Sequence, residues 1–228
     1  MFVKHEFINF FRNPAVIVVV LLPIFMSKIM MTVMEIAEAQ LLMLSIWILF
    51  AQIMIGIMLM GPDLIEERET KTIDALLCTP LNYAQIIIGK ALPVIVFSLL
   101  SQLIILLINA NVADFDPLIL IPMGLGTIIF AEIGIVIGLL VSSSKNGSAI
   151  SAVVFVCLFL VSSVYNVLPE WSYNFFYFIP SISLVELMNG ILNQNSVFVQ
   201  ELVITIFWVV ALSIYVFAIA TRRSYRKG

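Results

Sequence analysis

The chain has 228 residues, of which 62% are hydrophobic and 11% are charged, and its formal net charge is -3. So few polar side chains cannot cover a soluble globule, and we predict an integral membrane protein that binds no nucleic acid. The single histidine, His5, excludes a histidine-based metal site, and Cys78 and Cys157 provide no disulfide framework. The phosphate-binding pattern Gly-x-x-x-x-Gly-Lys-Ser/Thr is absent, so we expect no cofactor and no catalytic site in this chain.

Residues 1–13 predict a helix that lies in the membrane interface, because they combine an apolar face with basic residues outside it. The apolar face holds Val3, Phe7, Phe10 and Phe11, whereas Lys4, His5 and Arg12 lie off it. Asn13 followed by Pro14 then marks a helix start, since asparagine is a good cap and proline loses no hydrogen bond at the first helical position.

Six apolar runs are long enough to cross a bilayer as helices, since about 20 residues span its hydrocarbon core. They cover about residues 14–34, 41–60, 86–108, 118–141, 149–168 and 201–221. The sequence therefore predicts an all-α membrane protein with six transmembrane helices in a single domain, residues 1–228.

Residues 169–199, before the last run, contain apolar stretches that are too short to cross. Their aromatic residues are typical of the headgroup level of a membrane. We expect short external or re-entrant helices there, at the outer surface.

Residues 63–79, between the second and third spans, belong to a polar stretch and predict a short amphipathic helix at the membrane surface. Asp63 and Glu66 have the spacing of a capping box, which favours a helix start at this point. Pro80 disfavours helix at Thr79, and Asn82 with Gln85 indicates the start of the next helix.

Two polar residues fall deep within predicted spans. Gln52 would make either an interhelical hydrogen bond or a contact with a transported molecule. Glu132 lies near the midplane, where a carboxyl group is costly. It would contact an ion, a proton or a cationic substrate, or else hold helices together through a hydrogen bond. Gly134 and Gly138 form a GxxxG pair, which allows two helices to pack closely.

The distribution of positive charge predicts the orientation. Ten of the 11 lysine and arginine residues fall on the side of the two termini, and only Lys28 does not. Since cytoplasmic segments are enriched in these residues, we expect both termini and residues 63–79 to face the cytoplasm from the cell membrane.

The polar segment resembles a motif of ABC-2-type transporter permeases. The resemblance rests on residues 66–72, Glu-Glu-Arg-Glu-Thr-Lys-Thr, followed by Leu76-Leu77, Thr79-Pro80 and Gly89-Lys90. In that family this segment is the coupling helix, which sits in a groove of a separate ATP-binding subunit. With six spans in the corresponding order, the resemblance covers essentially the whole chain.

This resemblance implies the permease subunit of an exporter, paired with a second permease, identical or related, and with ATPase subunits that bind ATP and Mg²⁺. It implies ATPase contact through Glu66, Glu67, Arg68, Glu69, Lys71 and Asp74. A pathway between the permeases would carry an amphipathic small molecule, peptide or lipid, and Gln52 and Glu132 are the candidate residues along it. Phe50, Phe155 and Phe159 would suit such a cargo.

Two other functions stay open. A secondary transporter would work through Glu132 without ATP, although the sequence shows no convincing internal repeat. A membrane sensor or immunity subunit would bind a similar ATPase without transporting anything, and it would use the same helix.

Overall fold

The computed structural model describes residues 2–33, 37–78, 82–109, 116–165, 176–193 and 199–225. Six helices within these ranges are long and apolar enough to span a membrane, which confirms the predicted number of spans. The elements are α1 (Phe2–Arg12), α2 (Pro14–Val33), α3 (Ala37–Glu69), α4 (Thr72–Leu77), α5 (Tyr83–Asn109), η2 (Pro117–Ile119), α6 (Leu120–Leu140), α7 (Ser144–Val164), α9 (Pro180–Leu192) and α10 (Val199–Tyr225).

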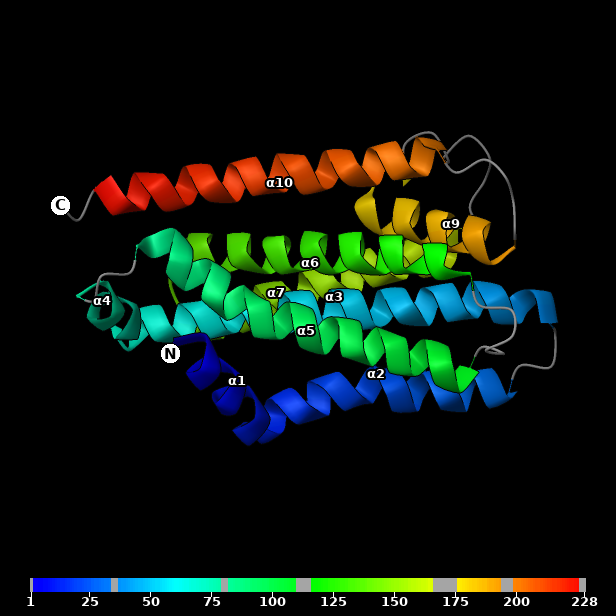
Figure 1. Ribbon diagram of the computed structural model, residues 1–228, viewed down its shortest axis with the longest axis horizontal. Coiled ribbons are helices and arrows are strands. Elements are labelled where there is room, and N and C mark those ends of the chain that lie inside the picture. Colours follow the sequence, from blue (N-terminus) through cyan, green and yellow to red (C-terminus); the bar gives the residue numbers. More distant parts are fainter. Residues whose placement is uncertain are drawn as a thin grey trace.

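The long helices run side by side, and both chain ends lie near α4 at one end of the bundle (Figure 1). We call this the α4 end. At the opposite end, Lys28 Nζ of α2 donates a hydrogen bond of 3.1 Å to the carbonyl oxygen of Ile108, in the last turn of α5. Lys28 therefore caps a helix terminus far from the basic residues of the α4 end.

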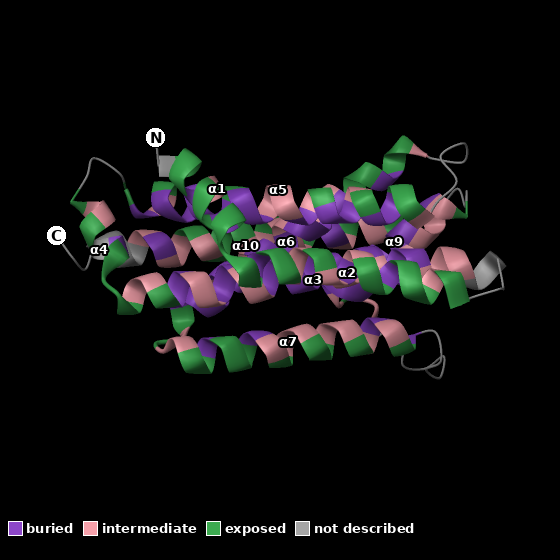
Figure 2. Ribbon diagram, turned by 90° about the horizontal axis from the view of Figure 1, so that it is seen from below, coloured by how far each residue is buried: buried purple, intermediate pink, exposed green. Residues whose placement is uncertain are grey.

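Helix α3 is the centre of the bundle, since it packs against α2, α5, α6, α7 and α9. Its side chains Ile48, Ile53 and Ile57 have no exposed surface. By contrast, α7 lies along one edge and is mainly exposed or intermediate (Figure 2). The other spans are therefore positioned largely by their contact with α3.

Glycines bring α3 and α6 into close contact. A Cβ atom on Gly134 would lie 2.6 Å from the carbonyl oxygen of Gly56, and one on Gly138 would lie 2.8 Å from Cβ of Leu64. Such distances leave no room for a side chain, so the GxxxG pair of α6 packs against α3 of the same chain. The glycines of α3 that complete this contact, Gly56 and Gly61, were not anticipated from the sequence.

The predicted helix start at Asp63 is wrong. Helix α3 continues through Pro62 and ends at Glu69, although proline removes one backbone hydrogen bond. Leu64 and Ile65 have no exposed surface, and this burial offsets the loss. Residues 63–69 are therefore the last two turns of a spanning helix, and only the six-residue α4 is separate from it.

The predicted start of α5 is confirmed. The backbone N–H of Asn82 donates to Oε1 of Gln85 at 3.0 Å, and the N–H of Gln85 donates to Oδ1 of Asn82 at 2.8 Å. These reciprocal bonds satisfy two amide groups that the helix itself leaves without partners. The turn predicted at Thr79 and Pro80 lies outside the described residues.

Helix α9, which falls in the predicted external segment, is packed within the bundle against α3, α6, α7 and α10. Ile182, Leu184 and Met188 are at most 1% exposed, and the hydroxyl groups of Ser162 and Ser181 join α7 to α9 at 2.7 Å. Residues 169–175 and 194–198 of this segment lie outside the described residues.

The α3–α6 contact predicts that Gly134→Ala lowers the free energy of unfolding by about 1–3 kcal/mol, because the added methyl group must push two backbones apart. Gly124→Ala is the matched control, since a Cβ there meets no atom within 4 Å. Equilibrium unfolding in mixed detergent–SDS micelles measures both. Equal stability of the two variants would contradict the close contact.

Candidate functional site

The candidate site begins at the α4 end, where Arg68 joins α3 to α6. Its Nη1 atom donates to the carbonyl oxygens of Gly138, Leu139 and Val141 at 2.7, 3.1 and 3.0 Å. Carbonyl groups in the last turn of a helix have no partner within it, and a cation there also complements the helix dipole. Arg68 thus holds the end of α6 against α3.

Glu69 joins α3 to the start of α7. Its Oε1 atom accepts a hydrogen bond of 3.0 Å from the backbone N–H of Ser144, the first residue of α7. Oγ of Ser143 accepts from the N–H of Asn146 at 3.3 Å and caps the same turn. The connection between α6 and α7 is therefore fixed to the last turn of α3.

Lys90 of α5 is a buried cation surrounded by carboxylates. Its side chain is 1% exposed, and Nζ lies 2.5 Å from Glu67, 3.1 Å from Glu6 and 3.3 Å from Asp63. Glu6 belongs to α1, whereas Asp63 and Glu67 belong to α3. A buried lysine is stable only when it is paired, so this cluster ties α1, α3 and α5 together. We call it the Lys90 cluster.

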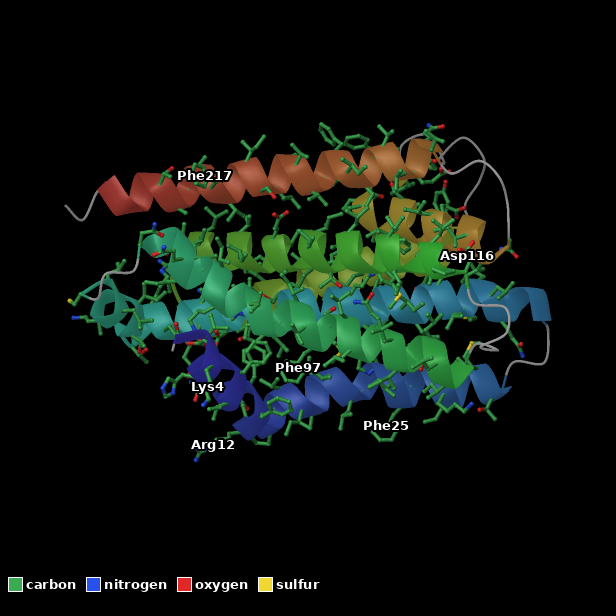
Figure 3. All side chains as sticks on the ribbon, in the orientation of Figure 1. Lys4, Arg12, Phe25, Phe97, Asp116 and Phe217 are labelled. Carbon is green, nitrogen blue, oxygen red and sulfur yellow. The ribbon has the colours of Figure 1, made fainter. Side chains whose placement is uncertain are left out.

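The aromatic face of α1 packs on α5. The rings of Phe7, Phe10 and Phe11 have centroids 6.3, 5.8 and 4.9 Å from that of Phe97 (Figure 3). Lys4 and Arg12 lie on α1 outside these contacts and are exposed. The amphipathic pattern of residues 1–13 thus corresponds to a helix with one face on the bundle.

Of the six residues expected at an ATPase contact, five have described side chains, and these fall into two groups. Glu67 and Arg68 are half-buried and bonded within the chain, as described above. Glu66, Glu69 and Lys71 are exposed, and Lys71 adopts a left-handed backbone conformation, φ 58°, between α3 and α4. The side chain of Asp74 lies outside the described part of the structure.

Helix α4 is anchored by Ile73, which is 3% exposed, while Leu76 and Leu77 are half-buried. Its exposed residues, including Ala75, face away from the bundle. The tip formed by Glu66, Glu69, Lys71 and α4 is therefore a solvent-accessible surface on a firmly held base. We call it the α3–α4 tip.

Gln52 lies inside the bundle and has no exposed surface. Its Nε2 atom donates to Oε1 of Gln102 at 2.9 Å, and Nε2 of Gln102 donates to Oγ1 of Thr127 at 2.7 Å. These bonds link α3, α5 and α6, which is the interhelical role considered for Gln52.

Glu132 lies instead at a groove between α5, α6 and α10, with a volume of about 290 Å³. The hydroxyl group of Ser213 donates to its Oε1 atom. Its Oε2 atom is buried and has no hydrogen-bond partner among the described residues.

Aromatic residues join α3 to α7. The ring of Phe50 lies 5.4 Å from that of Phe155 and 4.9 Å from that of Phe159, with Trp47 beside it at 5.2 Å. All of them are half-buried. In the described ranges, no three or more His, Cys, Asp or Glu residues are grouped so as to hold a metal ion.

The Lys90 cluster predicts that Lys90→Met destabilises the protein by about 3–5 kcal/mol, because three acidic groups then lose their cation. Adding Glu67→Gln should recover part of this loss. Exposed Lys71→Met is the control, and SDS unfolding measures all three variants. If Lys90→Met were no more harmful than Lys71→Met, the cluster would not hold the helices together.

The family model described as ABC-2 family transporter protein matches residues 38–222, which include every described helix from α4 to α9 and most of α3 and α10. Comparison with curated proteins found no match. The chain therefore belongs to the ABC-2 family of multi-pass transporter proteins, whose permeases associate with an ABC ATPase subunit.

Proposed function

We propose that the chain is the permease subunit of an exporter, paired with a second permease and driven by ATPase subunits that bind ATP and Mg²⁺. The α4 end would face the cytoplasm, in agreement with the positive charge gathered there. The cargo would be an amphipathic small molecule, peptide or lipid.

The observation that carries this proposal is the attachment of the α3–α4 tip. The last turns of α3 are bonded to α6 through Arg68, to α7 through Glu69 and to α1 and α5 through the Lys90 cluster. Displacement of the tip by a partner would therefore move several helices together. A loop helix held only by its two chain connections would bend instead.

The ATPase would contact the exposed part of the tip. Glu66, Glu69 and Lys71 offer charges of both signs to a partner, and Asp74 belongs to the same segment. Glu67 and Arg68, which the sequence also indicated as ATPase contacts, would instead hold this surface in position through their bonds within the chain.

The pathway would run between the two permeases along the aromatic face of α3 and α7. Phe50, Phe155 and Phe159 present half-buried rings at the edge of the bundle, where a second permease would cover them. Aromatic and apolar walls suit an amphipathic cargo.

A secondary transporter is the other candidate, and it is favoured by the carboxyl oxygen of Glu132 that has no partner among the described residues. Such a protein would move its cargo in vesicles without any ATPase.

The double charge reversal Glu66→Lys/Lys71→Glu tests the proposed function. We expect it to weaken ATPase binding about fivefold to tenfold, since each rim charge contributes modestly to such an interface. ATP-dependent transport should fall with it, while unfolding stays unchanged because neither side chain is buried. The measurements are co-purification with the ABC ATPase and its stimulated ATP hydrolysis in nanodiscs.

Lys4→Glu, a charge reversal at an exposed residue of α1, is the control. It should leave ATPase binding and ATP hydrolysis unchanged. Unaltered binding and hydrolysis in the double variant would refute contact at the tip. Transport that persists without ATP would favour the secondary transporter.

A further inference from the structure

The groove beside Glu132 is bounded by three helices, and we call it the α10 groove. Of the described residues that line it, only Glu132 of α6 and Ser213 of α10 are polar. The remainder of the wall is aliphatic except for Phe217, and it includes Ile88 and Leu92 of α5. Its volume of about 290 Å³ is near the lower limit for ligand pockets, which suits one alkyl chain or one small ring system.

The groove opens sideways, toward the region that lipid chains would occupy. Ile88 on one rim and Phe217 on the other are each 64% exposed. Phe217 projects from α10, which lies at the edge of the bundle (Figure 3). A molecule dissolved in the hydrocarbon of the bilayer could therefore enter without passing through water.

Glu132 supplies an unfilled polar contact inside this apolar wall. Ser213 donates to Oε1, but Oε2 is buried and has no hydrogen-bond partner in the described part of the chain. An ionised carboxylate in hydrocarbon is costly without a counter-charge, and a buried acceptor without a donor is costly as well. A ligand with an N–H donor that can also be positively charged would remove both costs.

The depth of Glu132 excludes a phospholipid headgroup as this donor. Glu132 lies 12 residues after Leu120 and 8 before Leu140, the two ends of α6. At 1.5 Å per residue these separations are about 18 and 12 Å, so the carboxyl group is well inside the membrane rather than at its surface.

We propose that the α10 groove binds a membrane-dissolved amphiphile with a single amino group, which pairs with Glu132 while its apolar part lies along α5 and α10. A neutral amine can enter from the bilayer and take the proton of the neutral carboxyl group, so that the pair forms with no net change in charge. The aromatic face of Phe217 would further favour a cation here. As a statement about the exported cargo, which would bind here before it reaches the pathway between the permeases, this inference rests on the proposed function.

The test uses dodecylamine and a carbodiimide on the purified chain in phosphatidylcholine nanodiscs. Dicyclohexylcarbodiimide activates a carboxyl group in the membrane and takes up its oxygen as dicyclohexylurea, so that an amine held against the group forms an amide. We expect the dodecyl amide at Glu132, found by peptide mass spectrometry. Glu201, at the start of α10 and outside the groove, is the internal control. It should carry at least fivefold less dodecyl amide than Glu132.

Two variants of α10 distinguish the groove from general partition into lipid. Val216 lines the groove, so Val216→Phe should fill it and lower amide formation at Glu132 at least fivefold. Val210→Phe is the matched control, since Val210 is 51% exposed and does not line the groove. An excess of N,N-dimethyldodecylamine, which gains an N–H donor when protonated but cannot form a stable amide, should compete with dodecylamine, whereas dodecanol of the same chain length should not.

Equal amide formation at Glu132 and Glu201, or equal behaviour of the two phenylalanine variants, would overturn the proposal. So would coupling of phosphatidylethanolamine to Glu132 when that lipid is present, because the occupant would then be a headgroup. No ATPase takes part in this experiment. If no amide formed at Glu132, the proposed function would therefore be unaffected. Likewise, if the double charge reversal at the α3–α4 tip left ATP hydrolysis unchanged, the proposed amine site would be unaffected.

Discussion

The arrangement of the α4 end depends on one buried cation. Lys90 is 1% exposed and has carboxylates of α1 and α3 within 3.3 Å. Because an unpaired charge at such a position is far more costly than a paired one, the lysine constrains where both helices can lie. Arg68 and Glu69 extend the same constraint to α6 and α7. The α3–α4 tip is therefore held firmly, because the charged residues beneath it are paired within the chain.

Deeper in the bundle, helices cannot rely on the hydrophobic effect, because lipid chains are as apolar as leucine. Packing and interhelical hydrogen bonds replace it. The backbones of α3 and α6 approach at Gly56 and Gly134, and one turn further from the α4 end Gln52 bonds to Gln102. These contacts make α3, α5 and α6 one unit, whereas α10 contributes few buried residues.

The sequence was sufficient for the features that depend on local composition. It predicted the six spans and the cap at Asn82, since each follows from apolar length or from neighbouring residues. It failed at Asp63, where a capping pattern indicated a helix start but the burial of Leu64 and Ile65 keeps α3 continuous. The partners of Lys90 could not be predicted, because Glu6 is 84 residues away and pairs with it only after α1 packs on α5. The α10 groove likewise exists only once α10 is placed beside α5 and α6.

Rigid and loosely packed regions thus occupy different sides of one protein. A partner that binds the tip acts on helices that move together, and α10 lies outside this charged connection although it forms one wall of the groove. Movement of α5 and α6 relative to α10 would change the width of that groove. The same displacement would alter the surroundings of Glu132, because its hydrogen-bond partner Ser213 belongs to α10. Work done at the tip could in this way change how strongly the carboxyl group holds a ligand, without any direct contact between the two sites.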